Sequence, residues 1–292
     1  MKLFIIGLCG QSVFLRVPHF HAPGETLHAE SLFSEPGGKG YNQAVAARRM
    51  GAEVVFAGAV GRDAEGDLCE ARLTEEGIAS CLIRKPERTA YASILTDDRG
   101  ENRVTVFPGA RLRVSDIRGL EDRFAEAGMV LLTPEIPEEV FAEAIALAKK
   151  HGVRVAVNPA PFFPWVRKYL ESAWLLTPNG SEARAMFDCG SEGLPGGLPG
   201  ALAASRYPRV IVTLGGEGAL CAEDGVITKI PAPSVTVRDT TGAGDCFNGV
   251  LCARLLEGYS LTDAAGKAVL AASLSVAHPH VLDGMPRREE IG

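Results

Sequence analysis

The residues with the clearest chemical potential form the stretch 239–249, Asp-Thr-Thr-Gly-Ala-Gly-Asp-Cys-Phe-Asn-Gly. Two glycines flank an alanine directly before Asp245, and an apolar run at 247–256 follows. This pattern predicts a tight loop that opens a buried helix. Backbone N–H groups at such a helix start favour an anion such as phosphate. Asp245 lies just past them, where its carboxylate could either cap the helix or accept a proton from a bound substrate.

Two further polar clusters follow apolar strand patterns. Asn179 and Glu182 are three residues apart, a spacing that is typical of a helix capping box. Thr213, Gly215 and Gly218 follow the run Val-Ile-Val and fit a strand end with its turn. In open α/β sheets, ligands bind beyond the carboxyl ends of the strands. We therefore expect both clusters and the glycine loop to share one cleft.

The elements that must position these residues alternate between strand and helix, which predicts parallel strands with right-handed crossovers. The fold class expected is α/β, with three α/β/α layers around a mainly parallel central sheet. The expected strands are 3–6, 54–58, 129–132, 154–158, 174–176 and 210–214, with a hairpin at 220–222 and 226–230. The expected helices are 42–51, 65–76, 137–150, 165–172, 181–188, 243–257 and 262–277, and 190–200 is expected to be a loop.

Two segments do not fit the alternation. Residues 11–36 mix β-forming residues with prolines and show no helical period, and residues 89–107 predict a hairpin around a polar turn at 97–100. We expect them to form a small separate β-sheet, a lid on a single domain that spans residues 1–292. The chain shows no internal repeat.

Composition excludes several classes of partner. The 292 residues are 46% hydrophobic and 23% charged, and the formal net charge of −6 leaves no basic field for nucleic acid. No apolar stretch is long enough to span a bilayer, and the first apolar run breaks at Gly7, so we expect no membrane association and a cytoplasmic protein. Seven cysteines without a C-x-x-C pair indicate reduced thiols and no zinc site.

Neither common nucleotide fingerprint is present, because Gly37-Gly38-Lys39-Gly40 lacks the P-loop spacing and the first strand is not followed by G-x-G-x-x-G. The stretch 239–249 instead resembles the second signature of the ribokinase-like, or phosphofructokinase-B, family of carbohydrate kinases. Residues 37–61 resemble the first signature. Shorter matches, most similar to the ribokinases of this family, lie in family order at 23–26, 158–161, 177–182 and 213–218.

The resemblance implies a kinase that transfers the γ-phosphoryl group of ATP to a hydroxyl, which we expect to be a primary one, of a small sugar. The backbone N–H groups of Gly242, Ala243 and Gly244 would form the anion hole that holds the transferring group. Asp245 would be the general base that accepts the proton of the attacking hydroxyl. Cys246, beside this loop, is expected to be a small buried residue and not a nucleophile.

The resemblance also assigns the nucleotide and metal side. Asn179 and Glu182 match the N-x-x-E element that organises Mg²⁺ and its waters near the phosphates, with Glu182 acting through water. Thr213, Gly215 and Gly218 match positions that border the ribose and phosphates of ATP. A capping role for the first pair and a turn for the second set remain compatible with this assignment.

A monovalent cation such as K⁺ would lie beside the anion hole in the family, with Asp239 and Thr241 as ligands. The chain departs from the family here, because His-Pro-His-Val-Leu-Asp-Gly at 278–284 replaces the loop that completes the site. We expect His278 and His280 to be surface loop residues and not metal ligands.

On the substrate side, Gly38, Lys39 and Asn42 match positions near the sugar hydroxyls, and Glu135 matches an acidic sugar contact, although a lone Glu after a strand also fits a solvated loop. Ser12 is a departure, since the ribokinases carry an aspartate there that accepts two hydroxyls. One hydroxyl group cannot replace a bidentate carboxylate acceptor. Ribose is therefore in doubt, while another pentose, a related furanose or a nucleoside fits.

Three functions follow from these patterns. The leading one is an ATP-dependent sugar kinase whose lid excludes water and joins two subunits into a homodimer. The second is a nucleoside kinase of the same fold, and the third is a sugar or nucleotide sensor without catalysis. The intact Gly-Ala-Gly-Asp and N-x-x-E elements favour the kinases.

Overall fold

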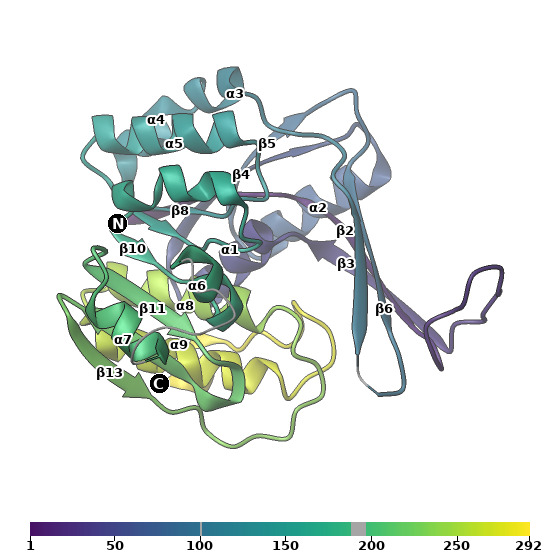
Figure 1. Cartoon of the computed structure of the whole chain (residues 1–292). Helices are drawn as coiled ribbons and strands as arrows, with labels where there is room; N and C mark the ends of the chain where they lie inside the picture. The colour runs from purple at the N-terminus through teal and green to yellow at the C-terminus, as the bar shows by residue number, and fades with distance from the viewer. Residues whose placement is uncertain (100, 188–196) are drawn as a thin grey trace.

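The computed structural model describes residues 1–99, 101–187 and 197–292. A nine-stranded sheet forms its centre, in the order β13-β12-β11-β10-β9-β8-β1-β4-β5 (Figure 1). The strands from β11 to β5 run parallel, and β12 and β13 form an antiparallel hairpin at one edge. The strands are β1 Lys2–Ile6, β4 Glu53–Val60, β5 Ala79–Arg84, β8 Ala127–Leu132, β9 Arg154–Val157, β10 Leu175–Leu176, β11 Arg209–Thr213, β12 Ala219–Glu223 and β13 Val226–Ile230.

Helices cover both faces of the sheet because its strands are apolar on both sides. In β1, Leu3 and Ile5 point into one buried cluster, and Phe4 and Ile6 point into the other. The first cluster is closed by α1 Lys39–Arg49, α2 Ala64–Glu75, α8 Ala243–Leu256, α9 Leu261–Ser275 and α10 Arg288–Ile291. The second is closed by α3 Val114–Arg118, α4 Glu121–Glu126, α5 Glu138–Lys150, α6 Gly180–Met186 and α7 Gly197–Ala203. The three layers expected from the sequence are confirmed.

A second sheet of four strands projects from the body beside α2, on the right in Figure 1. Its order is β3-β2-β6-β7, with β2 Gly10–Arg16, β3 Ser31–Gly37, β6 Ala90–Thr96 and β7 Asn102–Phe107. The pairs β2–β3 and β6–β7 are antiparallel, whereas β2 and β6 run parallel. The expected separate sheet from residues 11–36 and 89–107 is therefore confirmed. We call it the small sheet.

The helix starts near the site follow from local capping. Asp63 precedes α2, and its Oδ1 accepts the backbone N–H of Gly66 at 3.0 Å. Before α6, Asn179 Oδ1 accepts the backbone N–H of Glu182 at 2.9 Å, and Glu182 Oε2 accepts that of Asn179 at 2.8 Å. This reciprocal pair is the capping box that the spacing predicted.

Several details differ from the sequence expectation. The helix expected at 165–172 is instead two 3₁₀ helices, Pro164–Lys168 and Leu170–Ser172, since a segment this short favours tight single turns. The loop expected at 190–200 ends earlier, because α7 begins at Gly197, and residues 190–196 lie outside the described residues. Strand β5 and helices α3 and α4 were not predicted. Within the described ranges, no helix combines the length and apolar character needed to cross a membrane.

Candidate active site

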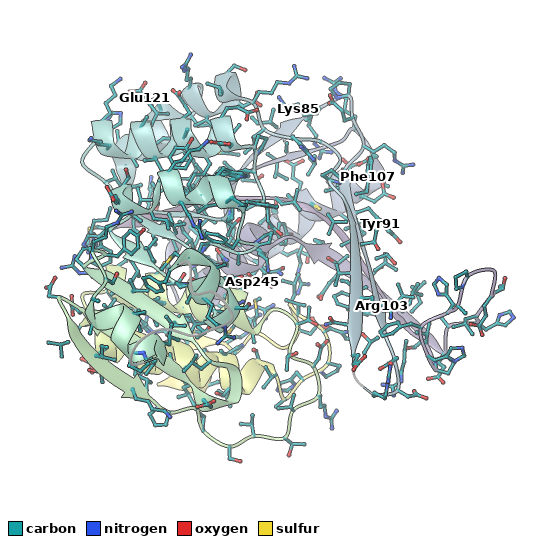
Figure 2. The ribbon with its side chains drawn as sticks, viewed as in Figure 1. Lys85, Tyr91, Arg103, Phe107, Glu121 and Asp245 are labelled. Atoms are coloured by element: carbon teal, nitrogen blue, oxygen red, sulfur yellow. The ribbon has the colours of Figure 1, made fainter. Side chains whose placement is uncertain are left out.

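Asp245 occupies the first turn of α8, near the centre of the molecule (Figure 2). Its side chain is buried, and its two carboxylate oxygens accept different donors. Oδ2 accepts from Asn42 Nδ2 at 3.0 Å, and Oδ1 accepts from Gln43 Nε2 at 3.2 Å. No side chain caps α8 at Gly242 among the described residues. The carboxylate is therefore directed into a polar cluster, and the capping alternative is not what the structure contains.

A chain of buried amide and hydroxyl groups supports this carboxylate. Gln43 Nε2 also donates to Asn158 Oδ1 at 3.1 Å, and Asn158 Nδ2 donates to the carbonyl oxygen of Thr177 at 2.8 Å. The Thr177 hydroxyl contacts Asn248 Oδ1, and Asn248 Nδ2 returns to the carbonyl oxygen of Gly244 at 2.8 Å. Each member fixes the next, which holds the start of α8 rigidly against α1 and the strand ends.

Sequence reasoning did not single out Gln43 or Asn248, and it noted Asn158 and Thr177 only as parts of short family matches. Their available signal was their polarity, since Gln43 and Asn248 each interrupt a helix whose other buried residues are mostly apolar. A buried amide usually has a hydrogen-bond partner. The sequence could not show that this partner was the carboxylate of a distant helix.

The charges of the site stabilise one another. Burial raises the pKa of Asp245, while the nearby ammonium of Lys39 and the donors of Asn42 and Gln43 oppose that rise. The same attraction to Asp245 raises the pKa of Lys39. An ammonium group and a buried carboxyl group therefore lie in one site, which suits the handling of a proton and of phosphate charge together.

The loop before α8 has the geometry of an anion site. Gly242 adopts a left-handed conformation with φ of 77°, and a Cβ atom built on it would lie 2.2 Å from Val281 Cγ1. A Cβ built on Gly244, in contrast, would meet nothing within 4 Å, so the space over that turn is open. The N–H end of α8 therefore faces an unfilled volume.

A cavity of about 210 Å³ occupies this space. It brings together Lys39, Asn179, Glu182, Thr213, Gly242, Gly244 and Asp245 from the sequence-derived set, with Ala160, Thr240 and three members of the amide chain. The expected shared cleft is thus present. The other sequence-derived residues do not line it, namely Ser12, Gly38, Asn42, Glu135, Gly215, Gly218, Asp239, Thr241 and Ala243.

Asn179, Glu182 and Thr213, which were expected near the nucleotide and its metal ion, line the same cavity. Thr213 forms a parallel bridge with Asn179, which joins the end of β11 to the start of α6. Burial raises the pKa of Glu182, whose carboxylate lines the cavity. Among the described residues there is no cluster of three or more His, Cys, Asp or Glu side chains that could hold a metal. A single carboxylate and an amide fit Mg²⁺ that retains water and phosphate ligands, because this ion rarely uses an all-protein cage.

The two glycines after β11 have different surroundings. A Cβ built on Gly218 would lie 2.0 Å from the carbonyl oxygen of Ile230, so this glycine is required by the packing of β13. A Cβ built on Gly215 meets nothing within 4 Å, and Gly215 is exposed. The space beside Gly215 is therefore open, whereas Gly218 serves the turn.

The residues expected near the sugar lie where β3 leads into α1. Gly38 precedes the first turn of α1, and the backbone N–H of Lys39 donates to Glu135 Oε2 at 2.8 Å. Burial raises the pKa of Glu135 to about 7. Ser12 Oγ lies close to Gly37, 2.5 Å from where a Cβ atom would stand. Asn42 Oδ1 is buried without a hydrogen-bond partner among the described residues.

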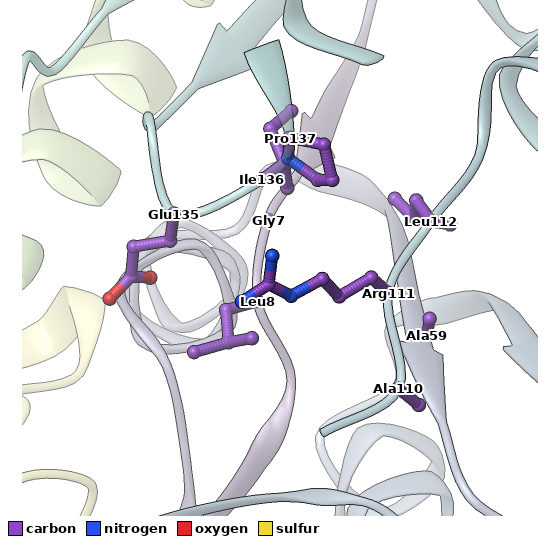
Figure 3. A pocket seen from close by; sticks show the side chains of 9 residues that line it. All are labelled: Gly7, Leu8, Ala59, Ala110, Arg111, Leu112, Glu135, Ile136 and Pro137. Atoms are coloured by element: carbon purple, nitrogen blue, oxygen red, sulfur yellow. The ribbon is translucent and has the colours of Figure 1, made fainter. Parts of the chain in front are cut away.

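Glu135 also borders a second, smaller cavity of about 10 Å³, which is the size of one water molecule (Figure 3). Arg111 reaches into this region from the segment that carries Ala110 and Leu112, and its side chain extends toward Leu8. The sequence analysis did not single out Arg111. Glu135 thus lies at a boundary between the body and this segment, and it is not a solvated loop residue.

In the region that the sequence assigned to a monovalent cation, one oxygen of the Asp239 carboxylate accepts a hydrogen bond. Asp239 Oδ1 accepts the backbone N–H of Thr241 at 2.8 Å, which closes the loop on itself. The expectation that both histidines are surface residues holds for His278, which is exposed, but not for His280. The His280 ring is half-buried and stacks on Phe33 of the small sheet, with ring centroids 3.5 Å apart. The aromatic partner, which is 247 positions away in sequence, could not be foreseen.

Cys246 is buried in α8, and burial raises the pKa of its thiol to about 12. A thiolate is the reactive form of cysteine, and at neutral pH this side chain is almost entirely a thiol. The interpretation of Cys246 as a small buried residue agrees with this environment.

Comparison with known proteins gives a consistent result. A model of the pfkB family of carbohydrate kinases matches residues 2–288. A ribokinase of Lactococcus lactis is 34% identical over 295 residues, which cover 99% of this chain and 95% of that protein. The structure of ribokinase from Giardia lamblia superposes with a TM-score of 0.90 at 27% identity, covering 99% of this chain and 98% of the other.

A third comparison includes ligands. The structure of an Arabidopsis thaliana ribokinase complexed with ribose and ATP superposes with a TM-score of 0.86 at 26% identity, covering 99% of this chain and 97% of the other. The matched family model spans nearly all of the chain, and the sheet order and glycine loop described above fit it. The chain therefore belongs to the pfkB family of carbohydrate kinases, and it is an ATP-dependent phosphotransferase with a ribokinase-like fold.

Proposed function

We propose that this kinase phosphorylates a primary hydroxyl of a small furanose sugar, with Asp245 as general base. The observation that carries this proposal is the buried carboxylate of Asp245, held by Asn42 and Gln43, at the edge of the cavity beside the glycine loop. A carboxylate in this position accepts the hydroxyl proton while the attacking oxygen faces the phosphoryl group. Its raised pKa makes it a better proton acceptor than an exposed aspartate.

The backbone of Gly242, Ala243 and Gly244 holds the transferring phosphoryl group in this proposal. The open space over Gly244 and the N-terminal end of α8 support it. The ammonium of Lys39, which lines the same cavity, supplies positive charge. Phosphoryl transfer depends mainly on such positioning and charge neutralisation.

ATP is proposed to lie along the side of the cavity formed by Asn179 and Thr213, with Gly215 and Gly218 in the turn beyond. Glu182 would hold Mg²⁺ through water, and the ion would neutralise phosphate charge. Asp239 and Thr241 are proposed as ligands of a monovalent cation such as K⁺. Activity measured in K⁺ against Na⁺ buffers tests that last assignment, and equal rates in both would contradict it.

The sugar is proposed to lie between Ser12, Gly38, Lys39, Asn42 and Glu135. The unpartnered Asn42 Oδ1 and the carboxylate of Glu135 provide acceptors for sugar hydroxyls. Ser12 provides one hydroxyl where two acceptors would be needed for a bidentate contact. We therefore place the preferred substrate among pentoses or furanoses other than ribose.

The small sheet is proposed to be a lid on a single domain spanning residues 1–292, and to join two chains in a homodimer. Leu32, Tyr91 and Phe107 support this, because their large apolar side chains are exposed on it at 68%, 41% and 55%. Sedimentation of the wild type and of Tyr91→Lys/Phe107→Lys tests the arrangement. A dimer that persists unchanged in the double variant would contradict it.

The function is tested by ADP release in the presence of ATP, Mg²⁺ and a panel of ribose, 2-deoxyribose, arabinose, fructose and nucleosides. Release that depends on one furanose, with ³¹P NMR locating the phosphate on a primary hydroxyl, supports the proposal. Preference for a nucleoside would favour the nucleoside kinase, for which the aromatic rings of Phe14 and Phe33 beside His280 are the supporting observation. Tight sugar binding without ADP release from any substrate would favour the sensor.

A further inference from the structure

Glu35 is a buried carboxylate that the reaction described above does not use. It lies on β3 of the small sheet, opposite Ser12 in the register, and is only 6% exposed. Its two oxygens accept the backbone N–H groups of Val281 at 2.8 Å and Leu282 at 3.1 Å. A single side chain of the small sheet therefore satisfies two consecutive amides of a loop in the body.

The body holds the same loop from its other side. Arg49, at the end of α1, donates to the carbonyl oxygen of Leu282 and, at 2.8 Å, to that of Met285. The backbone N–H groups of Val281 and Leu282 are thus hydrogen-bonded to the small sheet, whereas the carbonyl oxygens of Leu282 and Met285 are hydrogen-bonded to the body. Buried backbone groups that lose their partners are costly. Movement of β3 away from the body would leave the amides of Val281 and Leu282 without Glu35.

Two aromatic contacts strengthen this attachment. Phe33 lies on the same face of β3 as Glu35, two residues earlier, and its ring stacks on His280, the residue before Val281. Phe14 of β2 packs against both rings, with centroids 6.2 Å from each. The small sheet therefore holds the segment 280–282 through one carboxylate and two aromatic side chains.

The loop that contains Val281 and Leu282 packs directly against the glycine loop at 242–244. Val281 Cγ1 lies so close to Gly242 that a Cβ atom there would be 2.2 Å away. Gly242 is the left-handed residue that turns the chain into α8. A shift of Val281 thus changes the support under the N–H groups that face the cavity.

We propose that Glu35 is a positioning residue that couples the small sheet to the anion hole, so that the phosphoryl site is fully formed only while the small sheet is docked. The inference rests on the proposed function for its kinetic consequence. Strand β3 runs on into Gly38 and Lys39, so the strand that approaches the substrate also holds the loop under the phosphate. Substrate binding and phosphate alignment are joined through one element.

The groups around Glu35 include both hydrogen-bond donors and charged side chains. Burial raises the pKa of Glu35, the two loop amides lower it, Asp283 raises it and Arg72 lowers it. Arg72 reaches across to Asp283, with Nη2 3.8 Å from Oδ1. Arg72 belongs to α2, and the two amides and Asp283 belong to the loop. The carboxylate of Glu35 is therefore surrounded by groups of the body.

The test compares Glu35→Ala and Glu35→Gln with Ser34→Ala, an exposed neighbour on the same strand. Glu35→Ala is expected to lower kcat about 10- to 100-fold with the KM for ATP changed less than about threefold, as for a small displacement at the reacting centre. Glu35→Gln keeps only one of the two acceptor oxygens and should give a kcat between those of the wild type and Glu35→Ala. Hydrogen exchange at Val281 and Leu282 should rise at least about tenfold in Glu35→Ala and stay unchanged in Ser34→Ala.

Three outcomes would overturn the proposal: wild-type kcat in folded Glu35→Ala, unchanged exchange at 281–282, or a Glu35→Gln variant as impaired as Glu35→Ala. If Glu35→Ala fails to fold, Glu35→Gln combined with His280→Ala is compared with His280→Ala alone. Equal kcat in these two variants would be equally contradictory. The exchange measurement needs no substrate. A wild-type enzyme without sugar-dependent ADP release would therefore refute the proposed function while leaving the coupling measurable.

Discussion

Asn42 Nδ2 lies 3.0 Å from Asp245 Oδ2, although 203 positions separate the two residues in the sequence. This bond joins the first turn of α1, which follows the small sheet, to the first turn of α8, which carries the phosphate loop. Helices α1 and α8 pack closely because Gly249 lies against the backbone of Gln43, where a Cβ atom would be 2.4 Å from the carbonyl oxygen. Asp245 and the first turn of α1 are thus held in one rigid unit.

Asp245→Asn should lower kcat about 10²- to 10⁴-fold while ATP binding stays largely intact, because the variant removes the proton acceptor and keeps the side-chain size. Steady-state kinetics and calorimetric titration with ATP measure the two effects. Asp263→Asn, in the first turn of α9, is the matched control and should keep wild-type kcat. A turnover near that of the wild type in Asp245→Asn would remove this residue from the base role.

Gln43→Leu should shift the acidic limb of the kcat profile to higher pH. The base must be ionised, so activity falls as pH falls through the pKa of Asp245, which burial already raises. Loss of the Gln43 donor removes a hydrogen bond to the charged form and raises that pKa further. Gln11→Leu, the same change at another buried glutamine, should leave the limb in place. A limb that moves to lower pH would contradict this electrostatic account.

The KM for the sugar should depend on pH through Glu135, whose pKa burial raises to about 7. Above that pH the ionised carboxylate accepts sugar hydroxyls, and below it the protonated group loses acceptor capacity, so KM should rise as the pH falls. Glu135→Gln should raise KM and abolish this dependence. The KM for the sugar, measured between about pH 5.5 and 8.5 in the wild type and in Glu135→Gln, tests this prediction. An unaltered pH dependence in the variant would assign it to another group.

Gly242→Ala and Gly244→Ala should separate folding from catalysis. The first should lower both Tm and kcat, because its Cβ collides with Val281 and its φ of 77° is strained for alanine. The second should keep Tm and lower kcat, because its Cβ enters open space where phosphate is expected. Gly266→Ala in α9 also enters open space and is the control for both measurements. Wild-type kcat in Gly244→Ala would place the phosphate elsewhere.

Removal of the divalent ion with EDTA should abolish ADP release, and added Mg²⁺ should restore it. Glu182→Gln should raise the Mg²⁺ concentration needed for half-maximal rate, since a neutral amide attracts the hydrated ion less strongly. Glu182 also accepts the backbone N–H of Asn179, so Tm must be compared as well. A normal Mg²⁺ requirement in a folded Glu182→Gln variant would exclude this carboxylate from the ion site.

The layers, the strand ends and the glycine loop could be predicted from the sequence because each depends on local periodicity and turn residues. The side-chain contacts between these elements could not be predicted in this way. Gln43 reads as an ordinary helical residue until α8 brings Asp245 against it, and Glu35 reads as one polar position in an alternating strand. Strand β5 was missed because its six residues at the sheet edge carry mixed exposure and little alternation. Such contacts depend on tertiary packing, which local patterns in the amino-acid sequence do not show.

The close approach of α1 and α8 at Gly249 also has a consequence for how substrate preference can change. Asp245 and the glycine loop are fixed within the packed body, whereas Ser12 and Phe14 both belong to β2 of the small sheet. Substitutions on β2 can remodel the proposed sugar contacts without rebuilding the start of α8. Directed evolution toward new sugars should therefore enrich changes on β2 and leave Gly249 untouched.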